Sequence, residues 1–390
     1  MKQWDFSSIF LVILVILRVI RAENEGWVMI NGTHFMLETG EPYYRNGYNA
    51  YWLMTVASDI NHRNRVTALF QQASDHNLFL ARTWAFSDGG DQALQSSPGV
   101  YNETIFQGLD NVISMAGYHR QKLILSLVNN FNEYGGKAQY VAWANERGQS
   151  LSSDDDFFTN SVVKEYYKNH IKTVLTRKNT ITGTAYKDDS TIMAWELMNE
   201  PRCPSDASGK NLQNWIKEMA AYVKSIDNKH LLQVGLEGFY GPSNAEKNQG
   251  VTSGSQFGTD FIGNNQIPEI DFTTAHAYAD VWLNGTSDED QLSFLRKWIA
   301  IHIEDAQNIL KKPMILSEFG KSKTDPGFTV AKRDKLMNTV YSDIYSSAKG
   351  GGAAAGSLFW QLFPEGMESY QDGYAIVFSE SPTTADIINH

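Results

Sequence analysis

The sequence predicts an α/β fold, a single (β/α)8 (TIM) barrel preceded by a short N-terminal hairpin. Eight short apolar runs alternate along the chain with segments of helical apolar spacing, which is typical of parallel strands joined by helical crossovers. Most of these runs end in polar or aromatic residues, as barrel strands do at their functional rim. The 390 residues contain no internal repeat and no linker, so we expect residues 23–390 to form one domain.

The N-terminal segment predicts a leader and then a hairpin. Residues 9–17 are all apolar, but nine residues fall far short of the roughly 20 that span a bilayer. We therefore expect a secretory signal peptide at residues 1–22, cleaved near Ala22; a retained membrane anchor is the alternative. Residues 27–37 alternate in polarity and predict a hairpin with Asn31-Gly32 as its turn, closing the bottom of the barrel.

The barrel elements then follow in order. Strands are predicted from β-branched and aromatic runs, at residues 43–49, 77–84, 122–129, 191–201, 231–237, 271–278, 313–320 and 356–362. Helices are predicted from apolar residues three or four apart, at residues 65–73, 105–116, 158–177, 212–226, 291–310 and 333–346. Residues 130–158 read as irregular, with Asp154 to Asp156 opening the next helix, and residues 238–263 as a Gly-, Ser- and Asn-rich excursion.

Charge and cysteine content limit the partners and cofactors. The net charge of −11 argues against nucleic acid and against an anionic membrane surface, both of which need clustered Lys and Arg. Cys203 is the only cysteine, which excludes an intrachain disulfide and a CxxC zinc site. Neither a metal-ligand spacing nor a Gly-rich phosphate loop is present, so we expect no metal and no cofactor. Sequons at Asn31, Asn102 and Asn284 agree with secretion.

The ends of the predicted strands carry the chemistry. Because active sites of this fold gather at the C-terminal ends of the strands, we expect one rim to collect the polar and aromatic residues Arg82, Trp84, Asn129, Asn199, Glu200, Glu237, His276, Tyr278, Glu318 and Trp360. Two strand-end carboxylates, Glu200 and Glu318, among hydrogen-bond donors form the pair that glycoside hydrolysis needs. Flat indoles such as Trp84 and Trp360 would stack on sugar rings.

The same residues carry a family resemblance. The run from Trp195 to Pro201 (WELMNEP), with Arg82, His276, Tyr278, residues 317–320 (SEFG) and Trp360, resembles the retaining clan-A barrels of glycoside hydrolase family five. Residues 81–86, 129–136 and 188–195 resemble more narrowly the plant endo-β-1,4-mannanases (mannan endo-1,4-β-mannosidases). The resemblance extends over nearly all of the chain from Glu25.

This resemblance implies a role for each site residue. Glu200 would be the general acid/base, with its pKa raised by burial and by Glu318, and Glu318 would be the nucleophile. Arg82 and Tyr278 would donate to Glu318 and keep it ionised. Asn199 would bind the sugar 2-hydroxyl, and His276 would orient Glu200 or Tyr278. Trp360 would form the floor under the sugar, and Trp84 would stack on the substrate.

The resulting hypothesis is a secreted, extracellular, cofactor-free enzyme of the cell wall that cleaves internal β-1,4-mannosidic bonds in mannan, glucomannan or galactomannan with retention. Alternatives are a β-1,4-glucanase, a mannan transglycosylase and a non-catalytic sugar-binding barrel.

Several residues have structural interpretations beside the functional ones. Glu196 is expected to form an ion pair, with Arg45 as its candidate partner, Glu237 is ambiguous, and Trp52, Phe131 and Trp282 are either outer-subsite aromatics or buried loop residues.

Overall fold

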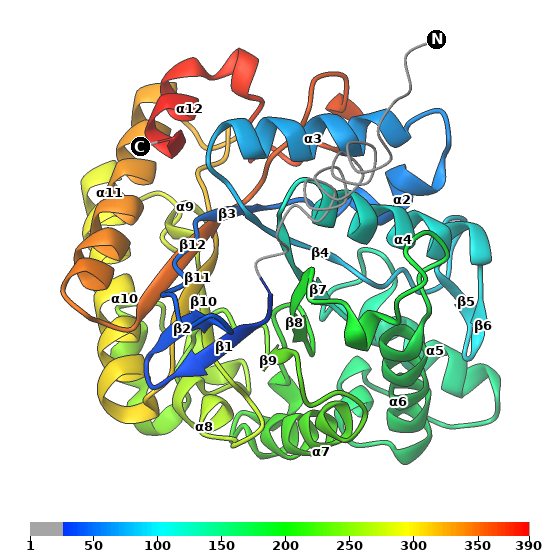
Figure 1. Cartoon of the computed structure of the whole chain (residues 1–390). Coiled ribbons are helices and arrows are strands. Elements are labelled where there is room, and N and C mark those ends of the chain that lie inside the picture. Colours follow the sequence, from blue (N-terminus) through cyan, green and yellow to red (C-terminus); the bar gives the residue numbers. More distant parts are fainter. Residues whose placement is uncertain (1–25, 390) are drawn as a thin grey trace, which may run out of the picture.

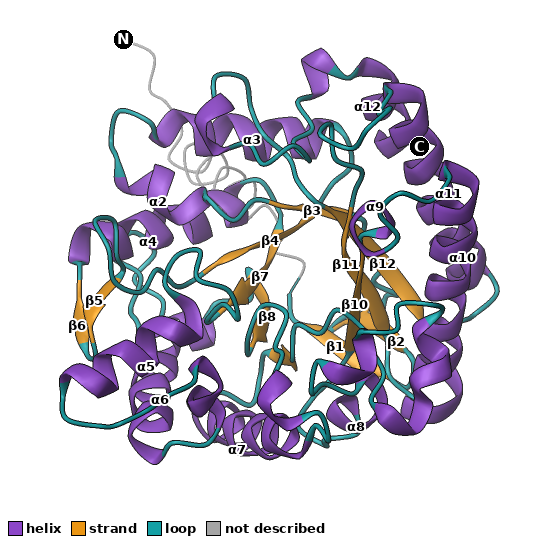
Figure 2. Cartoon of the chain, turned by 180° about the vertical axis from the view of Figure 1, so that it is seen from behind, coloured by secondary structure: helices purple, strands orange, loops and turns teal. Residues whose placement is uncertain are grey.

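The computed structural model describes residues 26–389, and the expected signal peptide lies outside this range (Figure 1). An eight-stranded parallel sheet forms the centre of the molecule, with helices around it (Figure 2), which confirms the predicted (β/α)8 barrel. In their order around the sheet the strands are β10 (Thr273–Ala277), β11 (Met314–Phe319), β12 (Ala354–Phe359), β3 (Gly47–Asn49), β4 (Leu80–Trp84), β7 (Lys122–Ser126), β8 (Ile192–Glu196) and β9 (Leu231–Gln233).

The ring closes between β9 and β10 through individual bonds rather than a regular ladder. The Asp271 backbone N–H donates to the Leu232 carbonyl at 2.8 Å, and the His276 N–H donates to the Glu237 carbonyl at the same distance. The Thr274 hydroxyl also donates to the Gln233 side chain at 3.0 Å. These bonds satisfy backbone groups that an open sheet edge would expose.

The described residues form the helices α2 (Leu53–Ser58), α3 (Arg63–Asp75), α4 (Glu103–Tyr118), α5 (Gly136–Glu146), α6 (Ser161–Thr176), α7 (Lys210–Ile226), α8 (Phe261–Asn265), α9 (Ala279–Trp282), α10 (Asp288–Asp305), α11 (Val330–Lys349) and α12 (Pro382–Asn389). The six predicted helices are present among them, and α2, α5, α8, α9 and α12 are additional. A small separate sheet is formed by β5 (Gln95–Ser97) and β6 (Val100–Tyr101).

The prediction for residues 130–158 was wrong. Helix α5 lies within this stretch, and its apolar residues are spread around the helix instead of forming one stripe, so no helical period was visible. The three aspartates form a separate 3₁₀ turn, Asp154–Phe158, that is capped by the Ser153 hydroxyl. Helix α6 begins later, with Asn160 as its N-cap.

The hairpin β1 (Val28–Asn31) and β2 (His34–Leu37) lies across one end of the barrel, drawn in blue in Figure 1. Its side chains join a core cluster with residues from the starts of the barrel strands, and Phe35 meets Phe272 edge to face at 5.2 Å. This confirms that the hairpin closes the bottom. The turn is Gly32-Thr33, one residue later than predicted, because Asn31 still pairs with His34.

No helix among residues 26–389 combines the length and the apolar character that a membrane crossing requires.

Asp88, in the loop after β4, is a buried carboxyl group without a cation partner. It is 1% exposed, accepts one hydrogen bond from Gln95 at 3.1 Å, and its Oδ2 is buried without a partner. Burial raises the pKa of Asp88 to about 8. Between pH of about 4, where an unfolded aspartate ionises, and about 8, the folded protein holds a proton that the unfolded chain has lost. The free energy of unfolding therefore falls as the pH rises through this window.

The Asp88→Asn variant should remove this pH dependence. We expect the gain in Tm over the wild type to be small at pH 4.5 and to reach roughly 2–4 °C at pH 7.5, measured by thermal unfolding at both pH values. Asp91→Asn, an exposed change in the same loop, is the control. An equal Tm difference at the two pH values would contradict the role given to Asp88.

Candidate active site

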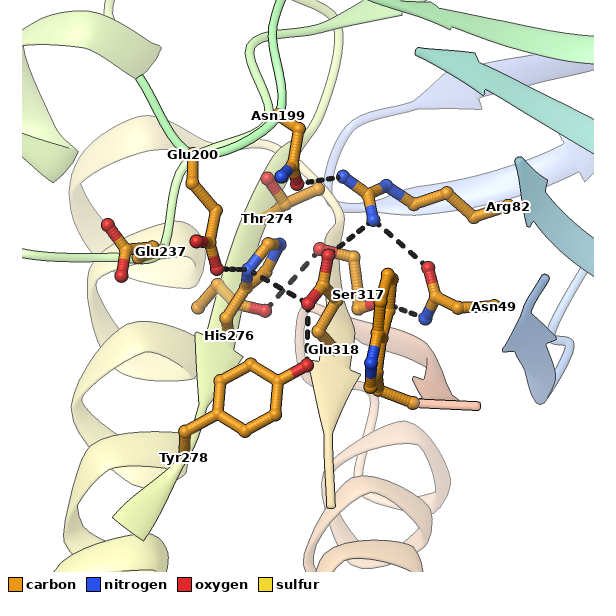
Figure 3. Close-up of polar contacts among 12 residues, drawn as sticks. Asn49, Arg82, Asn199, Glu200, Glu237, Thr274, His276, Tyr278, Ser317 and Glu318 are labelled. Atoms are coloured by element: carbon orange, nitrogen blue, oxygen red, sulfur yellow. Dashed lines mark hydrogen bonds and ion pairs between the residues drawn. The ribbon is translucent and has the colours of Figure 1, made fainter. Parts of the chain in front are cut away.

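An open cleft of about 550 Å³ lies at the C-terminal ends of the barrel strands. Eight of the ten predicted rim residues line it: Trp84, Asn199, Glu200, Tyr278, Glu318 and Trp360, together with Asn129 and Glu237. The other lining residues are Tyr51, Phe131, Glu133, Tyr134, Arg202, Val281, Trp282, Asp372 and Tyr374. Arg82 and His276 are fully buried; Arg82 contacts Glu318, and His276 contacts Glu200 and Glu318 (Figure 3).

Glu200 lies beyond the end of its strand, which corrects the prediction that places it at the end of a strand over residues 191–201. β8 ends at Glu196, and the next residues continue to bond to the neighbouring strands until the Glu200 N–H donates to the Gly235 carbonyl at 2.9 Å. Glu200 itself has φ of 50°, a left-handed conformation that is uncommon for a residue with a side chain.

Gly235 makes this close approach possible. A Cβ at this glycine, whose φ is 99°, would lie 1.9 Å from the Met198 carbonyl oxygen.

Glu318 is held by two donors, and both are the predicted ones. The Arg82 guanidinium donates to Oε1 at 2.5 Å, and the Tyr278 hydroxyl donates to Oε2 at 2.6 Å. His276, the register partner of Glu318 on the adjacent strand, lies 3.6 Å from Oε2 through its Nδ1. Both carboxylate oxygens of Glu318 are thus fixed in direction.

Arg82 is the centre of a larger buried network. It forms a bidentate ion pair with Glu196, with N···O distances of 2.7 Å and 2.6 Å. It also donates hydrogen bonds to the side-chain oxygens of Asn49, at 3.0 Å, and Asn199, at 2.7 Å. Glu196 is therefore a structural ion pair as predicted, but its partner is Arg82 and not Arg45. Burial lowers the pKa of Arg82, and the carboxylates of Glu196 and Glu318 outweigh that effect and raise it.

His276 connects the two cleft carboxylates. Its Nδ1 is hydrogen-bonded to Glu200 Oε1, and burial lowers its pKa, so the imidazole is neutral. One oxygen of Glu200, one of Glu318 and a ring nitrogen of His276 lie within 4.8 Å of one another. These three ligand types could hold a cation, but the Arg82 guanidinium already neutralises Glu318 and opposes a second positive charge.

The carboxyl groups of the cleft are perturbed mainly by burial. Burial raises the pKa of Glu200 to about 7, Arg202 and Arg82 oppose it, and Glu196 adds to it. The sequence had not pointed to Glu196 in this role; the repulsion between Glu200 and Glu318, to which it did point, raises the pKa of Glu318. Burial raises the pKa of Glu318 as well, and the Arg82 guanidinium and the Tyr278 hydroxyl act against it.

Aromatic side chains form one wall of the cleft. The Trp360 indole stacks on Tyr51, with ring centres 5.9 Å apart and planes inclined by 14°, and it lies 6.0 Å from Trp84. Phe131 and Trp282 also line the cleft, as one reading of the sequence suggested. Trp52 does not, because it is fully buried and stacks on Phe363.

Some cleft residues were missed in the sequence. Arg202 forms a bidentate ion pair with Glu237, with N···O distances of 2.6 Å and 2.5 Å. Its guanidinium also lies 3.9 Å from the centre of the Phe257 ring. This pair settles Glu237 as an ion-paired residue of the cleft. Arg202 follows Glu200 by only two positions, a signal that could have been used. Asp372 lies in a segment without periodicity, and no sequence signal places it here.

The sequence of this chain matches a protein family and several curated proteins. Residues 25–368 match the family model described as GH family 5 beta-mannosidase-like. The chain is 58% identical over 365 residues to mannan endo-1,4-beta-mannosidase 1 of Oryza sativa subsp. japonica, which covers 93% of this chain and 84% of the relative. It is also 58% identical over 364 residues to mannan endo-1,4-beta-mannosidase 7 of Arabidopsis thaliana, with the same coverage.

Solved structures agree with the sequence matches. The hyperthermostable endo-1,4-beta-D-mannanase of Thermotoga petrophila RKU-1 superposes with a TM-score of 0.79 at 32% identity, covering 89% of this chain and 98% of that one. The endo-1,4-beta-mannanase of Rhizomucor miehei superposes with a TM-score of 0.76 at 32% identity, covering 94% and 98%.

Proposed function

Because the chain belongs to the mannosidase-like group of glycoside hydrolase family 5, we propose that its cleft hydrolyses internal β-1,4-mannosidic bonds with retention of anomeric configuration. The observation that carries this proposal is the pair Glu200 and Glu318, whose carboxylate oxygens approach within 4.8 Å in an open, aromatic-lined cleft. Retaining enzymes hold their two carboxyl groups about 5–5.5 Å apart, whereas inverting enzymes leave room for a water molecule at roughly 6.5–9.5 Å. The short separation favours a covalent intermediate.

In the first step Glu318 attacks the anomeric carbon. It carries the negative charge of the pair, because it accepts from the Arg82 guanidinium and the Tyr278 hydroxyl, whereas Glu200 contacts only a neutral imidazole. Glu200, with its pKa of about 7, holds the proton and delivers it to the departing glycosidic oxygen. A bond forms between Glu318 and the sugar as the bond to the leaving oxygen breaks.

In the second step water replaces the enzyme on the sugar. Once Glu318 is esterified its negative charge is gone, so the pKa of Glu200 falls and the ionised group takes a proton from the incoming water. Released Glu318 recovers its bonds to Arg82 and Tyr278. The buried pair of Arg82 with Glu196 keeps the guanidinium in place during this cycle.

Substrate recognition rests on stacking and on neutral hydrogen bonds. Trp360 and Trp84 offer flat faces to the C–H surfaces of pyranose rings, with Trp360 as the floor beside the scissile bond. Asn199 is bound to Arg82 and to Asn129, and it is assigned to the sugar 2-hydroxyl. An acidic chain with this cleft suits an uncharged polysaccharide, namely mannan, glucomannan or galactomannan.

Secretion to the cell wall belongs to the same proposal. The apolar leader at residues 1–22 supports export, after which residues 23–390 would act as one catalytic domain. Asn31, Asn102 and Asn284 are all exposed, as glycan attachment requires.

The substrate proposal is tested by product analysis on four polymers. We expect reducing ends to be released from mannan, glucomannan and galactomannan, with a kcat/KM on cellulose lower by at least about 100-fold, because the two substrates differ at the 2-hydroxyl next to the reacting carbon. Proton NMR of the first products should show the β-anomer. Comparable rates on cellulose would favour the glucanase alternative, and α-anomers would exclude retention.

A further inference from the structure

The loop of residues 364–377, which follows β12, contacts the aromatic wall of the cleft. Its residue Asp372 is exposed and lines the cleft. One carboxylate oxygen of Asp372 accepts from the Trp360 indole N–H at 2.6 Å and from the Gln361 amide at 2.9 Å. The other oxygen accepts from the Tyr374 backbone N–H at 3.0 Å, which anchors the carboxylate in its own loop.

The indole N–H is the only polar group of Trp360, and a tryptophan side chain turns about two bonds. Stacking on Tyr51 fixes the plane of the ring, since the two planes are inclined by only 14°. Stacking alone leaves the ring free to slide and to rotate within that plane, and the bond to Asp372 removes this freedom. The same loop also holds Tyr51, because the Tyr51 hydroxyl donates to the Tyr370 carbonyl at 2.8 Å.

The loop also reaches the opposite side of the reacting centre. The Tyr374 ring meets the Tyr278 ring edge to face at 5.3 Å, and its hydroxyl donates to Asp280 at 3.1 Å. Tyr278 in turn donates to Glu318. The Tyr374 backbone N–H donates to Asp372, so the two contacts belong to one turn at the cleft.

We propose that Asp372 is a positioning residue that sets the orientation of the Trp360 indole. Through the indole it sets the position of the sugar that binds beside the scissile bond. This inference rests on the proposed function, in which Trp360 forms the floor of that sugar site. Asp372 acts through the indole and through no bond to the reacting atoms. Its loss should therefore displace the sugar relative to Glu318 without changing the protonation of either carboxyl group.

The Asp372→Ala variant should lower kcat/KM on mannohexaose by about 10- to 100-fold, since small displacements of a reacting group have effects of this size. The Asp372→Asn variant can still accept from the indole through its amide oxygen, and it should lose only about threefold. The profile of kcat/KM against pH should keep the acidic and the alkaline limb of the wild-type profile. Glu368→Ala, an exposed change in the same loop outside the cleft, should equal the wild type.

A double-mutant cycle separates positioning from a general loss of structure. Trp360→Phe keeps an apolar ring but has no N–H, so adding Asp372→Ala to it should cost less than about threefold further. Multiplicative losses in the double variant would overturn the inference, as would wild-type kcat/KM in Asp372→Ala. Failure of the wild type itself to cleave mannohexaose would instead overturn the proposed function, so the two failures are distinguishable. Circular dichroism of each variant checks that it is folded.

Discussion

Replacing Glu318 by glutamine should lower kcat on mannan by about four orders of magnitude or more, because no other group within reach can form the covalent intermediate. The fold should persist. A glutamine oxygen can still accept from Arg82, whose pair with Glu196 stays intact, so no buried charge is left without a partner. Glu318→Ala should be equally inactive but less stable, because the guanidinium loses one of its acceptors.

The measurement is reducing-end release at enzyme concentrations high enough to detect residual turnover, with thermal unfolding of each variant. Glu304→Gln, an exposed change on α10, serves as the matched control. Addition of azide to Glu318→Ala with an activated aryl mannoside should give an α-mannosyl azide, because the anion attacks from the face that the carboxylate has vacated. Near-normal turnover in Glu318→Gln would assign the nucleophile to another residue.

Replacing Glu200 by glutamine should lower kcat on mannan by about 10²- to 10⁴-fold, the contribution of a positioned general acid. The acid must be protonated, so the wild-type rate should fall as the pH rises through the Glu200 pKa of about 7, and the variant should lack this limb. An aryl mannoside with a leaving group that needs no proton should still form the glycosyl-enzyme rapidly. The intermediate should then accumulate, because no base activates water.

A burst of the released phenol followed by slow turnover, together with pH profiles from 4 to 9, checks this assignment. Glu237→Gln is an informative companion, because burial raises the pKa of Glu237 to about 7 as well. Glu237→Gln should keep the burst and the steady rate on the aryl substrate within about an order of magnitude. If Glu200→Gln kept the alkaline limb, Glu237 would be the better candidate for the acid.

The order of the barrel elements could be predicted because each strand is a short apolar run and most of the longer helices carry a three-to-four apolar spacing. Helix α7, for example, buries Leu212, Ile216, Met219 and Val223 on one face. Helix α5 was missed because its buried face carries the polar Lys137 and its exposed face the apolar Ala142, which erases the apolar stripe. Element ends were also set by tertiary contacts. β3 is reduced to Gly47–Asn49, and β8 ends before Glu200, where the chain turns through a left-handed residue beside Gly235.

Sequence patterns alone predict the fold class, the closure of the barrel bottom and the two carboxylates proposed as acid/base and nucleophile, because apolar strand runs and the residues that follow them are local properties of the chain. Only the tertiary structure decided which groups face one another: Arg82 with Glu196 instead of Arg45, Arg202 with Glu237, and Asp372 with Trp360. The perturbed pKa of Glu200 was likewise decided in three dimensions. Desolvation and ion pairing depend on distances between residues far apart in the chain, which no local pattern encodes.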